Sequence, residues 1–320
     1  MSVRGLTVRV PAGSLILVDD VSYDIGAGAV LGVVGETGAG KTMTIRASLG
    51  LLPRGVVADG IVRLGGEEVA LGPANPMRRF LGRSTGIVLQ NPLDMLDPLV
   101  RTGKQMLEGV THCGVMGPRA ARDRAEQLLG AMGFSDPERV MSLYPSELSG
   151  GMAQRVSIAL GLMPKPLIIA VDEPTSALDA QSRVEVLGLI RELCAAEGTG
   201  VIFISHDLDI VGRVCDTVAV MYAGRIVERG DTRVILGAPA HPYTKALLRC
   251  APSVESPPRT PLPSIKGAPP PPGTWPGGCL FAPRCPHALA RAEDERPQLR
   301  PALGRQVACH RAEELAEELV

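Results

Sequence analysis

The chain has 320 residues, a net charge of −1 and a hydrophobic fraction of 45%, with aromatic residues at only 3%. This length suggests one large α/β domain, or one domain with an appendage. The balanced charge gives no support for nucleic-acid binding, which usually leaves a strongly basic footprint. No stretch reaches the roughly 18 uninterrupted apolar residues that a transmembrane helix needs, and the first residues contain no apolar signal core. We therefore expect a cytoplasmic protein that reaches a membrane only through a partner.

The predicted elements follow one another in the manner of a parallel sheet. Residues 1–34 are predicted to be antiparallel β, with alternation at Leu6–Val10 and Val21–Ile25, and within them Val30–Val34 is continuously apolar, as in a strand covered on both faces. A mainly helical region runs from about 92 to 165. Two further apolar strands follow, at Leu167–Val171 and Val201–Ser205, with a helix between them. This order predicts an α/β fold with an antiparallel β subdomain, a parallel sheet and a helical subdomain.

A glycine-rich segment comes directly after the strand at 30–34. It matches the pattern G-x-x-x-x-G-K-[ST] and reads Gly35, Glu36, Thr37, Gly38, Ala39, Gly40, Lys41, Thr42. In such a loop backbone N–H groups surround phosphates, and the following helix N-terminus adds a partial positive charge. We expect Lys41 to reach the β- and γ-phosphates of a nucleotide and the Thr42 hydroxyl to ligate Mg²⁺. The alternative is a glycine turn that contains a lysine by chance.

Polar side chains follow three predicted strands, where the carboxyl ends of a parallel sheet bind ligands. Asp172 and Glu173 end one strand, His206 follows the next, and Gln90 follows a strand at 85–89. Asp172 is placed to contact Mg²⁺, and Glu173 could polarise an attacking water as a general base. Gln90 could contact Mg²⁺ or water. The alternative is that the acids are solvated and the histidine is structural.

A second candidate anion site begins the helix that follows Leu148. Ser149 is a suitable N-cap, and Gly150 and Gly151 leave bare N–H groups at the helix start. The alternative is an ordinary capped helix.

Together these ordered motifs resemble the ABC ATPase family over about residues 1–250. The segments that resemble its Walker A, Q-loop, signature, Walker B, D-loop and switch-histidine motifs are 35–42, Gln90, Leu148–Gln154, Asp172-Glu173, Ser176–Asp179 and His206. The resemblance implies a P-loop NTPase of the ABC-ATPase fold that uses ATP and Mg²⁺. It also implies a head-to-tail dimer, in which ATP lies between the phosphate loop of one subunit and Ser149, Gly150, Gly151 and Gln154 of the other, with Asp179 nearby. Glu173, His206 and Gln90 would then be the catalytic residues.

The sequence departs from the family where adenine is usually stacked on an aromatic residue. The corresponding stretch, Val10–Leu17, contains no aromatic residue, and Tyr23 lies too far into the next strand to be a clear substitute. How the base is held therefore has no answer in the sequence.

The C-terminal part, residues 251–320, begins with a proline-rich stretch that contains ten prolines between 252 and 276. We expect an extended linker or strap there. The segments 90–98, His241–Leu248 and Gly278–Pro286 resemble those of the oligopeptide, dipeptide and nickel importer ATPases.

Some members of that branch hold an iron–sulfur cluster with four tail cysteines. Here Cys279, Cys285 and Cys309 are present, but the remaining position is Ala292. His287 or His310 could complete a cluster site or a zinc site. The alternative, favoured by the short ligand count, is a folded tail without metal.

The resemblance implies an ATPase subunit at the cytoplasmic face of the cell membrane. Its partners would be a second ATPase subunit, identical or related, two membrane-spanning permease subunits and, indirectly, an extracytoplasmic solute-binding protein, with no nucleic acid. Import of dipeptides or oligopeptides is the expected function, with nickel or another small solute as the alternative. An exporter, a soluble ABC ATPase of repair or translation, and a non-transport P-loop kinase or GTPase are the rivals. The sequence does not identify the solute.

Overall fold

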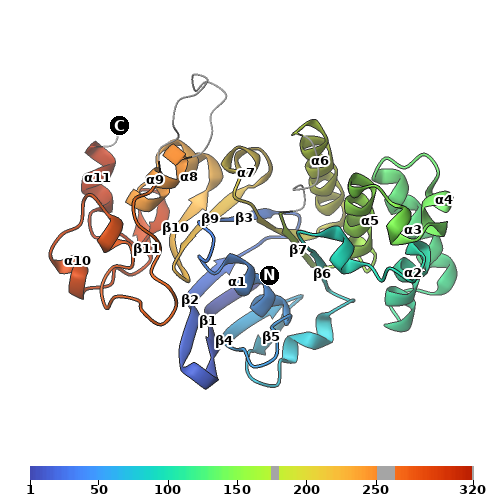
Figure 1. The fold of residues 1–320 in the computed structure, drawn as a ribbon, viewed down its shortest axis with the longest axis horizontal. Coiled ribbons are helices and arrows are strands. Elements are labelled where there is room, and N and C mark those ends of the chain that lie inside the picture. The colour runs from blue at the N-terminus through green and yellow to red at the C-terminus, as the bar shows by residue number, and fades with distance from the viewer. Residues whose placement is uncertain (174–179, 251–263, 319–320) are drawn as a thin grey trace.

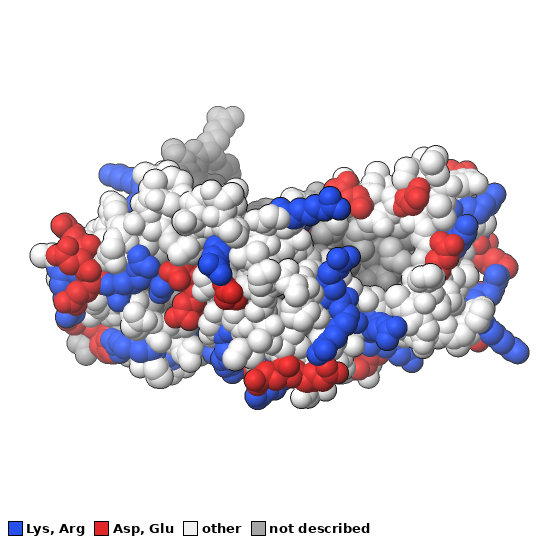
Figure 2. Space-filling model, turned by 90° about the horizontal axis from the view of Figure 1, so that it is seen from below, with Lys and Arg blue, Asp and Glu red and all other residues white. Residues whose placement is uncertain are grey.

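A computed structural model describes residues 1–173, 180–250 and 264–318. Two β-sheets form its centre, a group of helices lies at one end, and the C-terminal elements lie at the other (Figure 1). None of the helices within the described ranges is long and apolar enough to cross a bilayer. On the face shown in Figure 2, acidic and basic side chains lie interspersed, in keeping with the net charge of −1.

The smaller sheet is antiparallel and is built from the N-terminal part of the chain. Its strands, in spatial order, are β2 (Leu15–Asp24), β1 (Ser2–Val10), β4 (Val57–Leu64) and β5 (Glu67–Ala70). One face of β1 is buried through Val3, Leu6 and Val8. On β2, Tyr23 is also buried, and its hydroxyl donates a hydrogen bond to Ser48 Oγ at 2.6 Å. Tyr23 therefore belongs to the core.

The larger sheet contains the parallel strands. Its spatial order is β11 (Arg300–Ala302), β12 (Arg305–Val307), β10 (Arg225–Asp231), β9 (Thr217–Tyr222), β3 (Val30–Val34), β8 (Gly200–Ile204), β7 (Ile168–Asp172) and β6 (Thr85–Val88). Neighbours from β9 to β6 are parallel, whereas β10, β11 and β12 are antiparallel additions. Every residue of β3 and β8 is buried, as their continuous apolar runs predict.

The larger sheet is covered on both faces. Alternate residues of β3 face different apolar clusters, because successive side chains of a strand point to opposite sides. Val30 and Val34 pack with the helices, and Leu31 and Val33 pack with the smaller sheet. The helix α1 (Lys41–Leu49) contacts strands of both sheets.

The remaining helices fall into two groups. Those at one end of the molecule are α2 (Thr102–His112), α3 (Pro118–Ala131), α4 (Pro137–Ser142) and α5 (Gly150–Leu162) (Figure 1). Those that follow β7 in the chain are α6 (Ala180–Glu197), α7 (Leu208–Val214), α8 (Thr232–Gly237), α9 (Pro242–Cys250), α10 (Arg291–Asp294) and α11 (Ala312–Glu318).

The C-terminal region adds β12 to the edge of the larger sheet, beside the buried side chain of Glu228. Glu228 of β10 pairs with Val307 of β12 in the ladder, and its side chain is completely buried. The Glu228 carboxylate accepts hydrogen bonds from the backbone N–H groups of Ala240 and His241, at 2.8 and 3.0 Å. Arg305 of β12 supplies the positive charge, with Nη1 at 3.2 Å from Oε1. This strand pairing was not predicted, because β11 and β12 contain only three residues each.

Candidate active site

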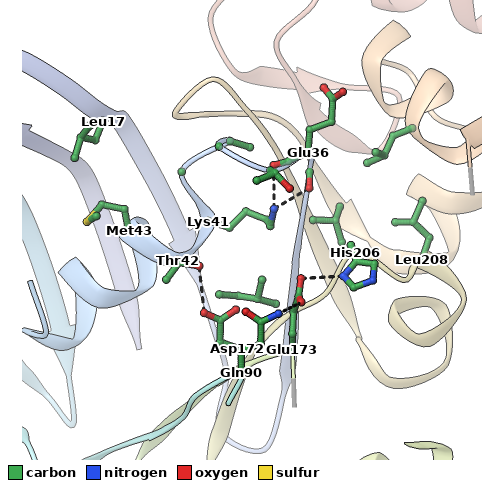
Figure 3. Close-up of a pocket in the computed structure, with 18 of the residues that line it drawn as sticks. Leu17, Glu36, Lys41, Thr42, Met43, Gln90, Asp172, Glu173, His206 and Leu208 are labelled. Carbon is green, nitrogen blue, oxygen red and sulfur yellow. Dashed lines mark hydrogen bonds and ion pairs between the residues drawn. The ribbon is translucent and has the colours of Figure 1, made fainter. Parts of the chain in front are cut away.

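A cavity of about 930 Å³ lies at the carboxyl ends of β3, β7 and β8. Its polar lining comes from the glycine-rich loop and from the residues that follow the strands (Figure 3). The labelled side chains that line it include Lys41, Thr42, Gln90, Asp172, Glu173 and His206. The structure therefore brings together the loop and the three strand-end groups that the sequence predicted.

The loop between β3 and α1 depends on glycine for its shape. Gly35, Gly38 and Gly40 have φ angles of 150°, 83° and 94°, which side-chain-bearing residues rarely adopt. A Cβ atom on Gly35 would lie 2.2 Å from the carbonyl oxygen of Met221. Lys41 Nζ donates hydrogen bonds to the carbonyl oxygens of Gly35 and Glu36, at 2.8 and 3.0 Å. The loop thus curls around an ammonium group at the N-terminus of α1, which is an arrangement suited to phosphate.

Thr42 and Asp172 form the candidate Mg²⁺ contact. The Thr42 hydroxyl donates a hydrogen bond to Asp172 Oδ2 at 3.1 Å. Burial raises the pKa of Asp172, and the hydrogen bond from Thr42 partly opposes that rise. A hydroxyl and a carboxylate oxygen side by side are hard ligands of the kind that Mg²⁺ prefers, so these residues fit the ion. When bound, Mg²⁺ would neutralise phosphate charge.

Glu173 is held by side chains from two other strands. Its Oε1 lies 2.9 Å from His206 Nδ1, and its Oε2 accepts a hydrogen bond from Gln90 Nε2 at 2.8 Å (Figure 3). The backbone of Glu173 has a φ angle of 46°, in the left-handed region. Such a conformation in a non-glycine residue costs roughly 1–3 kcal/mol and is concentrated at functional sites. The carboxylate is therefore aimed into the cavity at a local cost in stability.

The second candidate anion site lies apart from the cavity. Ser149 caps α5 by accepting a hydrogen bond from the Met152 N–H at 3.3 Å. Ser149 and Gly150 are exposed, and neither lines the cavity. Within one chain, these N–H groups and the phosphate loop do not form a common site.

Two of the predicted nucleotide-binding residues, Gln154 and Asp179, are not seen at the cavity. Gln154 is completely buried in α5 and does not line the cavity of its own chain, so its contact with a nucleotide bound to a second subunit stays a prediction. It is buried because it falls on the packed face of the helix, where Ala153, Val156 and Ser157 are also buried. Its amide atoms have no hydrogen-bond partner among the described residues. Asp179, with the rest of the segment 174–179, lies outside the described residues.

The cavity is lined by apolar side chains, and the aromatic residue that the family usually stacks on adenine is absent from Val10–Leu17. Leu17, Met43, Leu247 and Pro272 line it, and His206 is the single aromatic ring among the described lining residues. Leu247 and Pro272 had no signal in the sequence, because they lie more than 200 residues beyond the loop.

The described part of the proline-rich stretch, 264–276, is neither helix nor strand, as its proline content predicts.

The tail cysteines do not fit a four-ligand metal cluster. Across the part of the chain that the structure describes, no three His, Cys, Asp or Glu side chains are arranged to hold a metal ion. Burial raises the pKa values of Cys279 and Cys285 and raises that of Cys309 to about 11. Ala292, in the remaining position, is buried and has no donor atom.

The fold is that of solved ATP-binding cassettes. A dimeric cassette in a post-hydrolysis state, bound to ADP and Pi, matches with a TM-score of 0.63 and 23% identity over 72% of this chain and 98% of that chain. The protein cbiO1 from Clostridium perfringens, part of the ABC transporter complex cbiONQ, matches with a TM-score of 0.60 and 24% identity, over 73% and 91%. The chain therefore has the fold of an ATP-binding cassette.

Relatives in sequence narrow this class. The ABC transporter family model matches residues 18–176, and the model of the oligopeptide/dipeptide transporter C-terminal region matches residues 227–291. The Probable D,D-dipeptide transport ATP-binding protein DdpD of Escherichia coli (strain K12) is 42% identical over 88% of this chain and 86% of that protein. The oligopeptide transport ATP-binding protein AppD of Bacillus subtilis (strain 168) is 37% identical over 94% and 92%. The chain belongs to this family of dipeptide and oligopeptide transport ATP-binding proteins, which confirms the predicted family and fold class.

Proposed function

We propose that this ATPase energises the import of dipeptides or oligopeptides through two membrane-spanning permease subunits, from the cytoplasmic face of the membrane. The observation that carries the proposal is the joint match of the cassette and of the oligopeptide/dipeptide transporter C-terminal region within one chain. The names of the relatives support peptides as the cargo over nickel. An extracytoplasmic solute-binding protein would deliver the peptide.

At the site, ATP would occupy the cavity with its phosphates in the loop 35–42. Lys41 would turn from the loop carbonyls to the β- and γ-phosphates. Thr42 and Asp172 would hold the Mg²⁺ ion that accompanies the nucleotide. Glu173 would accept a proton from the attacking water, and His206 and Gln90 would orient its carboxylate, as their hydrogen bonds to it suggest.

A second ATPase subunit would complete the site. The exposed N–H groups at Ser149–Gly151 are separate from the cavity of their own chain, so a γ-phosphate could meet them only across a dimer interface. The partner could be a second copy or a related subunit. ATP would draw the two cassettes together, and hydrolysis would release them, moving the attached permeases.

Uptake of labelled peptide and of nickel would test this function, in cells whose single copy carries Glu173→Gln and in wild-type cells. We expect peptide uptake to be lost while nickel uptake continues. The control is Glu192→Gln, on an exposed position of α6, which should transport normally. Loss of nickel uptake alone would replace peptide by nickel as the cargo. Unchanged uptake of both would refute the import proposal and leave the ATPase assignment intact.

A further inference from the structure

The C-terminal region reaches the phosphate-binding loop at Glu36. Arg284, in the tail, holds the Glu36 carboxylate with both ends of its guanidinium group. The distance from Nη1 to Oε2 is 2.7 Å, and the distance from Nη2 to Oε1 is 3.0 Å. The Arg284 side chain is only 4% exposed and that of Glu36 is 26% exposed. A bidentate, charge-assisted pair of this kind is among the stronger polar contacts in proteins.

The guanidinium group is fixed independently of Glu36. Its Nε donates a hydrogen bond to the carbonyl oxygen of Lys266 at 2.9 Å, and Nη2 lies 3.3 Å from the carbonyl oxygens of Ile265 and Gly267. Nη1 is also 3.3 Å from the Tyr222 hydroxyl. Arg284 therefore presents a pre-organised fork to the loop, and little side-chain freedom is lost when Glu36 binds it.

The backbone of Glu36 is held as well. Its N–H donates a hydrogen bond to the Tyr243 hydroxyl at 2.8 Å, and its carbonyl oxygen accepts from Lys41 Nζ at 3.0 Å. The Tyr243 ring packs against Tyr222 and against Phe281 of the tail, with centroids 4.7 and 5.4 Å apart. The second residue of the loop is thus fixed by α9, by the tail and by its own lysine.

We propose that Arg284 is a positioning residue of the ATP site, which neutralises Glu36 and keeps its carboxylate turned away from the phosphates. The proposal rests on the proposed function only in that the loop binds nucleotide. Figure 3 shows the Glu36 carboxylate pointing away from Thr42 and Asp172. Without Arg284, the carboxylate would be free to turn toward a triphosphate that already carries several negative charges. Repulsion between them would then weaken ATP binding.

The test is the affinity of the full chain for Mg·ATP, measured by equilibrium dialysis for wild type, Arg284→Gln, Glu36→Gln and the double variant. We expect Arg284→Gln to raise the dissociation constant about tenfold, since a partly buried charge loses its partner. Adding Glu36→Gln should restore affinity to within about threefold of wild type, because the repelling charge is gone. Arg284→Lys, which keeps the positive charge, should also stay within about threefold.

The matched control is Arg300→Gln. Arg300 also forms a bidentate pair, with Glu313 at 2.6 and 2.7 Å, but both residues belong to the tail and are exposed. This variant should bind ATP as wild type does. Equal binding by Arg284→Gln and wild type would overturn the proposal, and so would a double variant as weak as Arg284→Gln. Failure of wild type to bind ATP would instead refute the ATPase assignment.

A measurement on the wild-type chain covers the case in which Arg284→Gln does not fold. Coupling between two sites is reciprocal, so ATP must stabilise the tail contact that favours its binding. Hydrogen exchange at the amides of Arg284 and Cys285, which are bonded to the carbonyls of Phe281 and Ala282, should slow when ATP is added. Unchanged exchange at these amides under saturating ATP would contradict the proposal.

Discussion

The Nδ1 atom of His206 lies 2.9 Å from Oε1 of Glu173, and these residues follow the neighbouring strands β8 and β7. Gln90, which follows β6, binds the other carboxylate oxygen at 2.8 Å. Glu173 is therefore held between two side chains that the parallel sheet delivers to the same edge. Each carboxylate oxygen has a second lone pair, so a water could bond to Glu173 while both partners stay in place.

We expect Glu173→Gln to bind ATP with nearly wild-type affinity and to hydrolyse it at least a hundredfold more slowly. An amide preserves the shape of the side chain and can still bond His206, but it cannot accept the proton of an attacking water. Phosphate release under saturating Mg·ATP, together with equilibrium binding, would separate the two effects. Glu192→Gln is the control, and hydrolysis by Glu173→Gln at a wild-type rate would exclude this residue as the general base.

We expect Asp172→Asn to remove most of the Mg²⁺ dependence of ATP binding. In wild type, the carboxylate and the Thr42 hydroxyl lie side by side and would offer Mg²⁺ two hard oxygen atoms, whereas a neutral amide is a much weaker ligand. The affinity of ATP should be measured with Mg²⁺ and with EDTA, for this variant and for Asp123→Asn on the exposed side of α3. We expect the ratio between the affinities with Mg²⁺ and with EDTA to fall by about tenfold or more in Asp172→Asn and to stay as in wild type in Asp123→Asn. A full Mg²⁺ effect in Asp172→Asn would place the ion elsewhere.

We expect Ser149→Arg to prevent ATP-dependent pairing of cassettes without weakening ATP binding by the single chain. Ser149 is exposed and does not line its own cavity. Light scattering on Glu173→Gln, which retains ATP, should show a dimer that disappears when Ser149→Arg is added. Ser142→Arg, at the exposed end of α4, is the matched control. A dimer that survives Ser149→Arg would show that this helix start is not part of the interface.

We expect the chain to lose stability as the pH falls below about 6.5, partly through His241. This side chain is 2% exposed, its Nδ1 accepts a hydrogen bond from the Tyr243 N–H, and burial lowers its pKa to about 3. Between about pH 6.5 and 3 the unfolded chain therefore binds a proton that the folded chain excludes. The free energy of unfolding falls by up to about 1.4 kcal/mol per pH unit in that window, and this contribution is fully present above it.

Urea unfolding at pH 7.5 and 5.5 would measure this dependence. His241→Gln should show a smaller loss between the two pH values than wild type, whereas His112→Gln, at an exposed position on α2, should match wild type. An equal loss in His241→Gln and wild type would mean that other groups cause the acid sensitivity.

The site residues that could be predicted are those that belong to a short motif or end an apolar run in the sequence. The loop 35–42 is recognisable because glycine, lysine and threonine occur at fixed spacing between a strand and a helix. Asp172, Glu173 and His206 were found because each ends a continuous apolar run, and the ends of parallel strands meet at one edge. Gln154 shows the limit of this approach, since its motif position did not reveal that it lies on the buried face of α5.

The contacts that the sequence did not reveal join distant parts of the chain. Tyr243 and Glu36 are 207 positions apart, and Arg284 and Glu36 are 248 apart. No periodicity connects such pairs, because they meet only after the C-terminal half of the chain has folded back onto the loop. The same holds for β11 and β12, which are too short to carry an alternating pattern and exist because the edge of β10 is there to pair with.

Because β10 pairs with β12, the boundary of the matched C-terminal family region does not coincide with a boundary between structural units. The matched C-terminal family region begins at residue 227, inside β10 itself. A protein shortened to residue 250 would leave one side of β10 open to pairing with other molecules, which is a common route to aggregation. It would also leave Glu228 buried without the counter-charge of Arg305. Tails exchanged between relatives would therefore have to bring an arginine to the position of Arg305, where it can contact this acid.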